Sequence, residues 1–402
     1  MKQAYLINGV RTPIGNLGGA LSAVRADDLL AHVIRELVKN NPGVDVNAIE
    51  DVIIGCANQS GEDNRNVARM SVLLAGLPVT VPAETVNRLC ASGLSASIAA
   101  TRAIWVGDAD LMIAGGVESM TRAPWVISKT STPFGRDAQM FDSSFGWRFV
   151  NPKMKEQYGV DAMGETAENL ADLFKISRID QDAFSLWSQQ KAAVAMAAGR
   201  FAKEIVAVQI PQKKGDPKIF DKDEFMKPDT TAEGLAKLKT SFRKDGTVTA
   251  GNASGLNDGA AALLLASETA IKQYNLKPLA RIVSSGVSGI EPRIMGYGPV
   301  EAANKALKKA GLTFNDLDVI ELNEAFAAQA LSCTRAWKLE DNDLRINPNG
   351  GAIALGHPLG MSGARILNSA AIELHQQNKK YALVTMCIGV GQGYAVVMER
   401  VQ

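Results

Sequence analysis

Cys90 has the clearest potential for chemistry, because it lies where a predicted strand becomes a predicted helix. The extended-looking segment 82–86 precedes it, and the segment 94–104 behind it is rich in alanine and free of glycine and proline, as expected of a buried helix. A helix N-terminus carries free N–H groups and partial positive charge, which favour a thiolate and lower the pKa of a thiol. This stretch alone leaves two alternatives open, an activated nucleophile or a structural buried cysteine.

Two further residues with catalytic potential lie in the last quarter of the chain. Asn323 directly follows the strand-like segment 319–322, which places it at the carboxyl end of a strand. His357 lies in the glycine-rich segment 350–360, ahead of another predicted helix. Imidazole is the most common general base at neutral pH, so His357 is a candidate partner for the Cys90 thiol.

Cys387 ends a predicted strand and is followed by a loop with three glycines, at positions 389, 391 and 393. Backbone N–H groups at glycines approach a ligand closely and bind oxyanions, which makes Gly389 a candidate binding group. The loop leads into the strand-like segment 394–398 rather than into a helix. This order argues against a dinucleotide-binding loop.

Strands and helices alternate around these residues. The strand-like segments are 4–7, 51–57, 110–116, 258–266, 319–322, 383–386 and 394–398, and the helix-like segments include 27–38, 64–76, 94–104, 166–174 and 181–199. This alternation predicts an α/β fold with parallel strands and with helices on both faces of the sheet.

The chain also contains a weak internal repeat with an offset of about 270 residues. The repeat pairs 51–55 with 318–322, 92–93 with 362–363, and 111–114 with 383–386. We therefore expect two similar halves, with a ligand cleft where equivalent strand ends meet. The predicted N-terminal half is 1–120 plus 248–272, the C-terminal half is 273–402, and the irregular segment 121–247 forms an inserted loop domain.

Composition excludes several classes of protein. The 402 residues include 43 Lys and Arg against 42 Asp and Glu, so no net charge favours nucleic acid or a membrane surface. Four cysteines without CxxC spacing predict neither a metal site nor a disulfide framework, and free thiols fit the cytoplasm. The N-terminal segment resembles a strand rather than a targeting signal, and we expect no apolar run of membrane-spanning length.

Four short motifs together resemble those of the thiolases: residues 87–93 (NRLCASG), 323–326 (NEAF), 356–360 (GHPLG) and 387–389 (CIG). The similarity extends over essentially the whole chain. It implies an α/β fold with a duplicated five-layer αβαβα core and an inserted loop domain, assembled as a homodimer or homotetramer. It also implies cleavage of a 3-oxoacyl-CoA, or the reverse Claisen condensation, with coenzyme A as co-substrate and no tightly bound cofactor.

The resemblance implies a role for each candidate residue. Cys90 is the nucleophile that carries the acyl group, and His357 accepts its proton. Cys387 protonates the departing acetyl-CoA carbanion and then deprotonates the incoming CoA. Asn323 acts through a bound water beside the imidazole in one oxyanion hole, and the N–H groups of Cys90 and Gly389 form the other.

The resemblance also indicates residues that bind CoA. The segment 250–255 is similar to a stretch in which a serine hydroxyl meets the pantetheine amide, which implies binding by Ala250 and Ser254. Lys227 stands where relatives often carry a basic residue near the adenine. It belongs to the locally basic stretch 213–244, whose lack of an aromatic stripe favours a phosphorylated ligand over nucleic acid.

Differences within the family indicate the acyl group. Relatives that act on acetoacetyl-CoA often have histidine one residue before Met163, where this chain has alanine. Segments 146–152 and 387–393 instead resemble thiolases that act on 3-oxoadipyl-CoA in the breakdown of aromatic compounds. That acyl chain ends in a carboxylate, for which Arg148 is a candidate partner, with a loop salt bridge as the alternative. We also expect Met163 and Phe326 to line the substrate site.

Three other functions are compatible with these features. An acetoacetyl-CoA thiolase or a fatty-acid β-oxidation thiolase shares the chemistry and differs in its acyl pocket. A ketosynthase typically uses two histidines with one cysteine, whereas this chain offers two cysteines and one candidate histidine. A non-catalytic lipid carrier is disfavoured because every reactive side chain is present.

Overall fold

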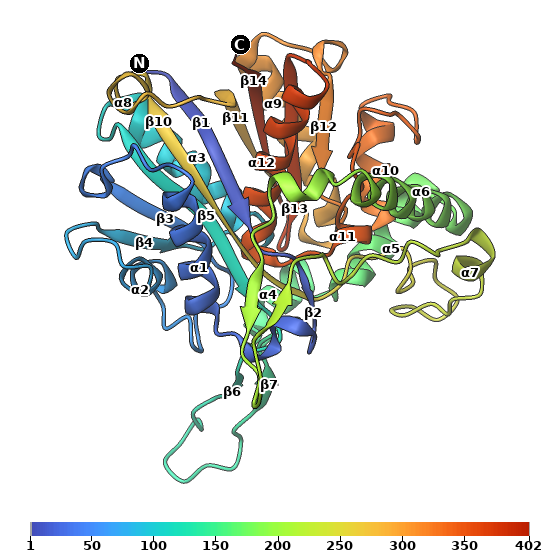
Figure 1. Cartoon of the computed structure of the whole chain (residues 1–402). Helices are drawn as coiled ribbons and strands as arrows, with labels where there is room; N and C mark the ends of the chain where they lie inside the picture. The colour runs from blue at the N-terminus through green and yellow to red at the C-terminus, as the bar shows by residue number, and fades with distance from the viewer. Residues whose placement is uncertain (1, 402) are drawn as a thin grey trace.

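A ten-stranded sheet runs through the computed structural model, which describes residues 2–401 (Figure 1). In pairing order its strands are β12 (Val319–Leu322), β13 (Tyr381–Ile388), β14 (Gln392–Arg400), β11 (Ala280–Gly289), β1 (Ala4–Arg11), β10 (Asn257–Ser267), β5 (Leu111–Ser119), β3 (Asp51–Gly55) and β4 (Ala83–Val86), with β2 (Gly15–Asn16) paired to β10. Two separate hairpins pair β6 (Trp125–Ile127) with β7 (Met140–Asp142), and β8 (Val208–Ile210) with β9 (Lys218–Phe220).

Helices of the two halves cover both faces of this sheet, and further helices lie in the segment between β5 and β10. Together they are α1 (Ala26–Lys39), α2 (Val67–Leu74), α3 (Ser92–Val106), α4 (Pro152–Tyr158), α5 (Met163–Phe174), α6 (Arg178–Ala197), α7 (Ala232–Ala236), α8 (Glu268–Tyr274), α9 (Gly298–Ala310), α10 (Ala327–Ala336), α11 (Ala352–Leu355) and α12 (Leu359–Gln376). The predicted helices and strands are therefore present, with boundaries that shift by a few residues.

The main sheet is mixed, and the prediction of parallel strands is correct only for part of it. β3 pairs in parallel with β4 and β5, and β12 pairs in parallel with β13. β10 runs antiparallel to β1 and β5, and β14 runs antiparallel to β11 and β13. β14 follows β13 through a short glycine turn and β10 follows the long insertion, so neither strand enters through the crossover helix that parallel pairing requires.

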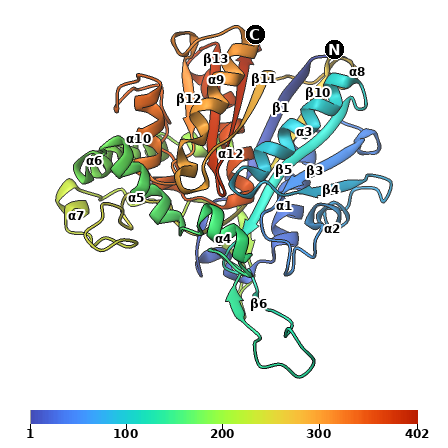
Figure 2. The same ribbon diagram turned by 180° about the vertical axis from the view of Figure 1, so that it is seen from behind.

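Three apolar clusters define three helical layers. The central cluster contains residues of α3 and α12, a second contains residues of α1 and α2, and a third contains residues of α9 and α10. Along β3, Val52 and Ile54 face the cluster of α1 whereas Ile53 faces the central cluster, as the two-residue period of a strand requires. The sheet strands separate these layers, which confirms the five-layer αβαβα order (Figures 1 and 2).

The internal repeat is confirmed by how the central helices meet. α3 and α12 begin against each other at glycines that are equivalent in the repeat. A Cβ added at Gly93 would stand 2.4 Å from the Gly360 carbonyl oxygen, and one added at Gly363 would stand 2.4 Å from the Leu94 nitrogen. Only glycine allows this approach.

The two halves are also joined edge to edge. β1 pairs antiparallel with β11 through Tyr5–Arg281 and Leu6–Ala280, so the sheets of the two halves form one continuous sheet. A repeat in the sequence does not predict this pairing of β1 with β11, because the edge strands of the two halves pair only after the halves have packed.

The segment between β5 and β10 contributes no described strand to the main sheet. It contains α4 to α7 and the two small hairpins, and it is anchored to β1 by buried ion pairs. Arg11, which is 1% exposed, places Nε 2.8 Å from Glu204 Oε1 and Nη1 2.7 Å from Asp223 Oδ1. Figure 1 shows the β6–β7 hairpin projecting away from the rest of the molecule.

Residues 89–106 contradict the expectation that no apolar run is long enough to span a membrane. This 18-residue helical segment has a mean hydropathy of 1.3, enough in length and composition for a membrane span. The expectation that no apolar run reaches that length is therefore wrong. In the fold 56% of the segment is buried, and α3 lies in the central layer against α12, so its apolar side chains form core.

Candidate active site

The turn that carries Cys90 connects β4 to α3. Cys90 is the middle residue of the 3₁₀ turn Leu89–Ala91, directly before α3. Leu89 has a left-handed φ of 46°. Ser92 Oγ accepts a hydrogen bond from the Arg88 N–H at 2.8 Å and donates one to the Leu89 carbonyl at 2.7 Å. The predicted strand-to-helix junction is confirmed, and Ser92 stabilises its sharp bend.

The predicted lowering of the Cys90 pKa is wrong. Burial raises the pKa of Cys90 to about 11, although the Gly389 N–H, which donates to its Sγ, acts in the opposite direction. Desolvation of a thiolate outweighs the two backbone N–H donors here. The thiol is therefore neutral at pH 7, and its attack on a carbonyl requires a base.

Cys387 and Gly389 belong to the β13–β14 hairpin and lie beside this turn. Besides the hydrogen bond to Cys90, a Cβ added at Gly389 would stand 3.2 Å from Leu89 Cδ1. Cys387 is fully buried, and its pKa is raised well above the usual value, first by burial and then by the charge of Cys90. The fold thus brings the two thiols close together, and the four cysteines are free.

His357 lies in the loop between α11 and α12 and is 4% exposed. Its Nδ1 is 2.6 Å from Ser362 Oγ, and the Ser362 hydroxyl donates to the Pro358 carbonyl at 2.8 Å. Since a hydroxyl has one hydrogen, Nδ1 is the protonated nitrogen and Nε2 carries the lone pair. Nε2 lies 3.4 Å from Asn323 Nδ2. Burial, assisted by the charge of Arg365, lowers the pKa of His357 to about 3, so the ring is neutral at pH 7.

Asn323 follows β12, as predicted, and is 1% exposed. Its backbone N–H donates to the Thr385 carbonyl at 3.0 Å, two residues before Cys387. Its Oδ1 is buried without a hydrogen-bond partner in residues 2–401. A buried amide oxygen of this kind can accept from a water or a ligand beside the imidazole, which suits the water-mediated role expected of Asn323.

The contact between α3 and α12 explains why these groups meet. Cys90 lies two residues before the first residue of α3, and His357 lies two residues before the first residue of α12. Because the Gly360 carbonyl packs on Gly93, both residues lie at the same end of the crossed helices. Within residues 2–401, no group of three or more His, Cys, Asp or Glu side chains is placed to hold a metal ion.

The residues expected to bind CoA fall into two groups. Lys227 and Ala250 line one pocket of about 270 Å³, together with Gln189, Phe225, Leu235 and Leu238 among others. Ser254 instead pairs with the segment after β12, because its N–H donates to the Ala325 carbonyl at 2.9 Å.

Met163 and Phe326 share an apolar cluster with Cys387. Met163 begins α5, and its Sδ would lie 3.9 Å from a Cβ added at Gly389. Arg148 is half-buried in the loop after β7, where its Nη1 donates to the Ser143 carbonyl at 3.4 Å. The structure therefore brings Met163 and Phe326 to the thiols, whereas the hydrogen bond recorded for Arg148 stays within its own loop.

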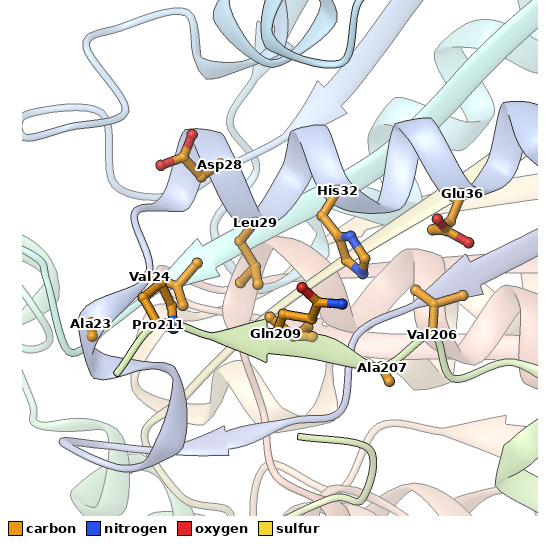
Figure 3. Close-up of a pocket in the computed structure, with 11 residues that line it drawn as sticks. Ala23, Val24, Asp28, Leu29, His32, Glu36, Val206, Ala207, Gln209 and Pro211 are labelled. Carbon is orange, nitrogen blue, oxygen red and sulfur yellow. The ribbon is translucent and has the colours of Figure 1, made fainter. Parts of the chain in front are cut away.

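A larger groove, of about 650 Å³, lies elsewhere, between α1 and the chain along β8 (Figure 3). Asp28, His32 and Glu36 line its helical side, and Val206 and Gln209 lie opposite. Its lining residues include no cysteine and none of the predicted site residues. The size of a pocket therefore does not locate the chemistry in this molecule.

Two residues of the site were missed in the sequence. The sequence pairs Ser362 with Ser92 in the internal repeat but indicates no role for its hydroxyl, whose oxygen lies 2.6 Å from His357 Nδ1 and fixes the tautomer of that ring. Glu118 is a buried carboxylate that accepts a hydrogen bond from Gly360, three residues after His357, and is connected to the Cys90 turn through Ala57 and Asn87. The available signal for Glu118 was an acidic residue inside β5, whose other residues are uncharged.

Comparisons with known proteins agree with this geometry. Residues 4–269 match the N-terminal thiolase domain, and residues 276–400 match the C-terminal thiolase domain. The chain is 60% identical over 401 residues to a beta-ketoadipyl-CoA thiolase of Acinetobacter baylyi, covering 100% of both chains. It is 59% identical over 401 residues to the 3-oxoadipyl-CoA/3-oxo-5,6-dehydrosuberyl-CoA thiolase of Escherichia coli, again covering 100% of both. The crystal structure of human mitochondrial 3-ketoacyl-CoA thiolase is similar with a TM-score of 0.92 and 42% identity, covering 100% of this chain and 99% of that one.

Proposed function

Because this chain belongs to the thiolase family over nearly its whole length, we propose that it cleaves a 3-oxoacyl-CoA with coenzyme A and catalyses the reverse condensation. The names of its relatives favour 3-oxoadipyl-CoA as the substrate. The products are then acetyl-CoA and succinyl-CoA. Coenzyme A is a co-substrate in this reaction, and no bound cofactor is required.

The first half-reaction transfers the acyl group to Cys90. As Sγ attacks the 3-keto carbon, its proton moves to Nε2 of His357. The bond between C2 and C3 then breaks, and its electron pair leaves as the enolate of acetyl-CoA. Cys387 donates the proton that converts this enolate to acetyl-CoA and is left as a thiolate.

The second half-reaction restores the enzyme. The Cys387 thiolate takes the proton of the CoA thiol, and the CoA sulfur attacks the acyl-enzyme. Cys90 leaves and recovers its proton from His357, so protons and electrons balance over the cycle. Asn323, through a water, stabilises the oxyanion beside the imidazole, and the Gly389 N–H stabilises the oxyanion of the acyl group.

The pKa values bear on the timing of the first step. Burial raises the pKa of Cys90 to about 11 and lowers that of His357 to about 3. A thiolate–imidazolium pair is therefore not the resting state, and proton transfer accompanies the formation of the carbon–sulfur bond. The approach of the Gly389 loop to the Cys90 turn is the observation that carries this proposal, because a Cβ added at Gly389 would stand 3.2 Å from Leu89 Cδ1 and the nucleophile therefore lies beside the loop that also presents Cys387.

Intact-mass spectrometry tests the roles of the two thiols. After incubation with acetyl-CoA, Cys90→Ser should form no acyl-enzyme, whereas Cys387→Ala should still be acetylated and then stall in the condensation half-reaction. Cys333→Ala removes another buried thiol and is the matched control, expected to turn over like the parent. Normal acylation of Cys90→Ser would refute the proposal.

The preference of the enzyme for its acyl group can be tested by substituting Arg148. We propose that Arg148 binds the terminal carboxylate of 3-oxoadipyl-CoA. Arg148→Gln should lower kcat/KM for this substrate by roughly tenfold or more and leave acetoacetyl-CoA cleavage unchanged. Arg136→Gln removes an exposed cation from the same region and should affect neither substrate. A parent enzyme that prefers acetoacetyl-CoA or long-chain substrates would favour the alternative thiolases.

The contacts described above support a CoA site formed by Lys227, Ala250, Ser254, Met163 and Phe326. Lys227 is the exposed cation of its pocket, suited to a phosphate of CoA. Lys227→Gln should therefore raise the KM for CoA severalfold and leave kcat unchanged.

We further propose that the chain acts in the cytoplasm as a homodimer or homotetramer, with the domain limits expected from the sequence. The β6–β7 hairpin supports self-association, because Trp125 is 69% exposed, Ile127 66% and Phe134 101%. Exposed aromatic and aliphatic side chains on a projecting hairpin favour a second copy of the chain. Light scattering of the triple serine variant at these positions should show a smaller particle than that of the parent.

A further inference from the structure

Glu118 is a buried carboxylate whose hydrogen-bond partners are backbone N–H groups rather than a cation. It is 2% exposed on β5. Its Oε2 accepts from the N–H groups of Ala57 and Gly360, each at 2.9 Å, and its Oε1 accepts from the N–H of Asn58 at 2.9 Å. The Cys56 sulfur lies 3.9 Å from Oε1. A buried charge without a counter-ion is costly, so its contacts indicate what it does.

One side of this carboxylate leads to the Cys90 turn. Ala57, whose N–H donates to Glu118 Oε2, also accepts a hydrogen bond at its carbonyl oxygen from Asn87 Nδ2 at 2.9 Å. Asn87 Oδ1 in turn accepts from the Leu89 N–H at 2.8 Å, directly before Cys90. A continuous chain of hydrogen bonds therefore connects Glu118 to the backbone of the nucleophile.

The other side leads to His357. Gly360, the second donor to Oε2, lies in the first turn of α12, three residues after His357. A Cβ at Gly360 would stand 2.2 Å from the Val117 carbonyl and 2.6 Å from the Gly55 carbonyl, so this helix end is pressed onto β5 and β3. Glu118 thus contacts the N-terminus of α12, where a negative charge is favourable.

We propose that Glu118, in its ionised form, is a positioning residue that holds the Cys90 turn and the His357 loop in register for acyl transfer. This inference rests on the proposed function. Ionisation is required because three N–H groups converge on the two oxygens, and a protonated carboxyl would turn one acceptor into a donor.

The ionisation of Glu118 makes its role dependent on pH. Burial raises the pKa of Glu118 to about 7. The titratable groups that face it are Cys56 and Asp63 from the segment after β3, and Cys90 from the turn before α3, while α12 contributes a backbone N–H. The ionised fraction, and with it kcat, should rise about tenfold from about pH 6 to about pH 8.

Glu118→Gln tests the proposal directly, because the amide has the shape of the carboxylate but only one acceptor oxygen. Its NH₂ group would face a backbone N–H that now donates to the carboxylate. We expect kcat at pH 8 to fall by roughly 10- to 100-fold with KM little changed, and the rise of kcat with pH to disappear. The charge of Glu118 opposes ionisation of Cys90. The pH midpoint of Cys90 alkylation by iodoacetamide should therefore fall in the same variant, a shift that simple loosening would not cause.

Asn87→Ala tests the same connection without touching the buried charge. Asn87 is exposed, so this variant should fold even if Glu118→Gln does not. We expect kcat to fall several-fold, and the double variant to lose little more than Glu118→Gln alone. Additive losses would overturn the coupling.

Glu373→Gln is the matched control. Glu373 is a buried glutamate on α12 that pairs with Arg200 at 3.2 Å, away from the reacting groups. The Glu373→Gln variant should be less stable than the parent, but its pH profile of kcat and its pH midpoint of Cys90 alkylation should be unchanged. Unchanged values in Glu118→Gln would refute the inference about Glu118. The alkylation measurement needs no acyl substrate, so it gives a result even if the proposed thiolysis fails.

Discussion

The two halves of the molecule place different chemistry on the same strand–turn–helix plan. Ser92 and Ser362 occupy equivalent positions in the first turns of α3 and α12. In the N-terminal half, Ser92 Oγ joins two backbone groups, the Arg88 N–H and the Leu89 carbonyl. This serine therefore shapes the main chain of the turn.

In the C-terminal half the equivalent hydroxyl orients a side chain. Ser362 Oγ connects Nδ1 of His357 to the Pro358 carbonyl. The duplicated backbone therefore places a serine at the same position in both halves, but the groups that the two hydroxyls contact differ. A sulfur nucleophile requires a fixed turn, whereas an imidazole base requires a fixed tautomer.

Removal of the reacting group from each half should have the largest effect. Cys90→Ala should lower kcat by roughly 10³-fold or more, because no acyl-enzyme forms. His357→Gln keeps the thiol and should lower kcat by roughly 10²- to 10⁴-fold. Steady-state cleavage of 3-oxoadipyl-CoA measures both. Normal turnover by His357→Gln would show that the second half does not supply the base.

The helix crossing shared by the halves can be broken at Gly93 or Gly363. Alanine inside a helix is usually about 1 kcal/mol more favourable than glycine. Here the added Cβ would stand 2.4 Å from a backbone atom of the other helix, so each substitution should lower the free energy of unfolding by roughly 2–3 kcal/mol. Urea denaturation measures this, with the exposed Gly234→Ala as a control expected to be neutral or stabilising.

The two equivalent serines should respond differently to substitution. Ser362→Ala leaves Nδ1 without its acceptor and should lower kcat by roughly 30-fold, about 2 kcal/mol, with a small change in stability. Ser92→Ala should mainly lower stability, by about 1–2 kcal/mol, because the Arg88 N–H loses its acceptor. Kinetics and thermal melting of both variants separate these effects. Identical behaviour of the two variants would contradict the different roles of Ser92 and Ser362.

The smallest expected effect is the pH dependence of stability that His357 contributes. The unfolded chain protonates this imidazole near pH 6.5, whereas burial lowers its pKa to about 3 in the fold. Acidification from about pH 7.5 to about pH 5.5 should therefore destabilise the native state by about 1.4 kcal/mol through this group. Glu118, with its pKa raised to about 7, acts in the opposite direction over this range.

A comparison of the parent with His357→Gln isolates the contribution of His357 to the pH dependence of the unfolding free energy. The parent should lose about 1.4 kcal/mol more of unfolding free energy than the variant over the same pH interval. Equal losses would mean that the folded imidazole titrates at its ordinary pKa.

Much of the fold was predictable, because periodicity and glycine placement are local properties. The positions of Cys90, Asn323 and Cys387 at the ends of strands follow from short apolar runs beside loop residues, and the repeat follows from similar runs at a constant offset. Strand direction was not predictable in the same way. β10 and β14 run antiparallel because of how the chain returns to the sheet, which no short segment encodes.

The sequence by itself determined the types and order of the reacting groups and, through its resemblance to the thiolases, the chemistry that they can perform. The tertiary structure decided their electrostatic state. Desolvation raises the Cys90 pKa instead of lowering it as expected. Glu118 accepts hydrogen bonds from the backbone N–H groups of Ala57 and Gly360, which are far apart in the chain. Both effects depend on the low polarity of the packed interior and on which groups meet there, and these properties exist only once the two halves have closed on each other.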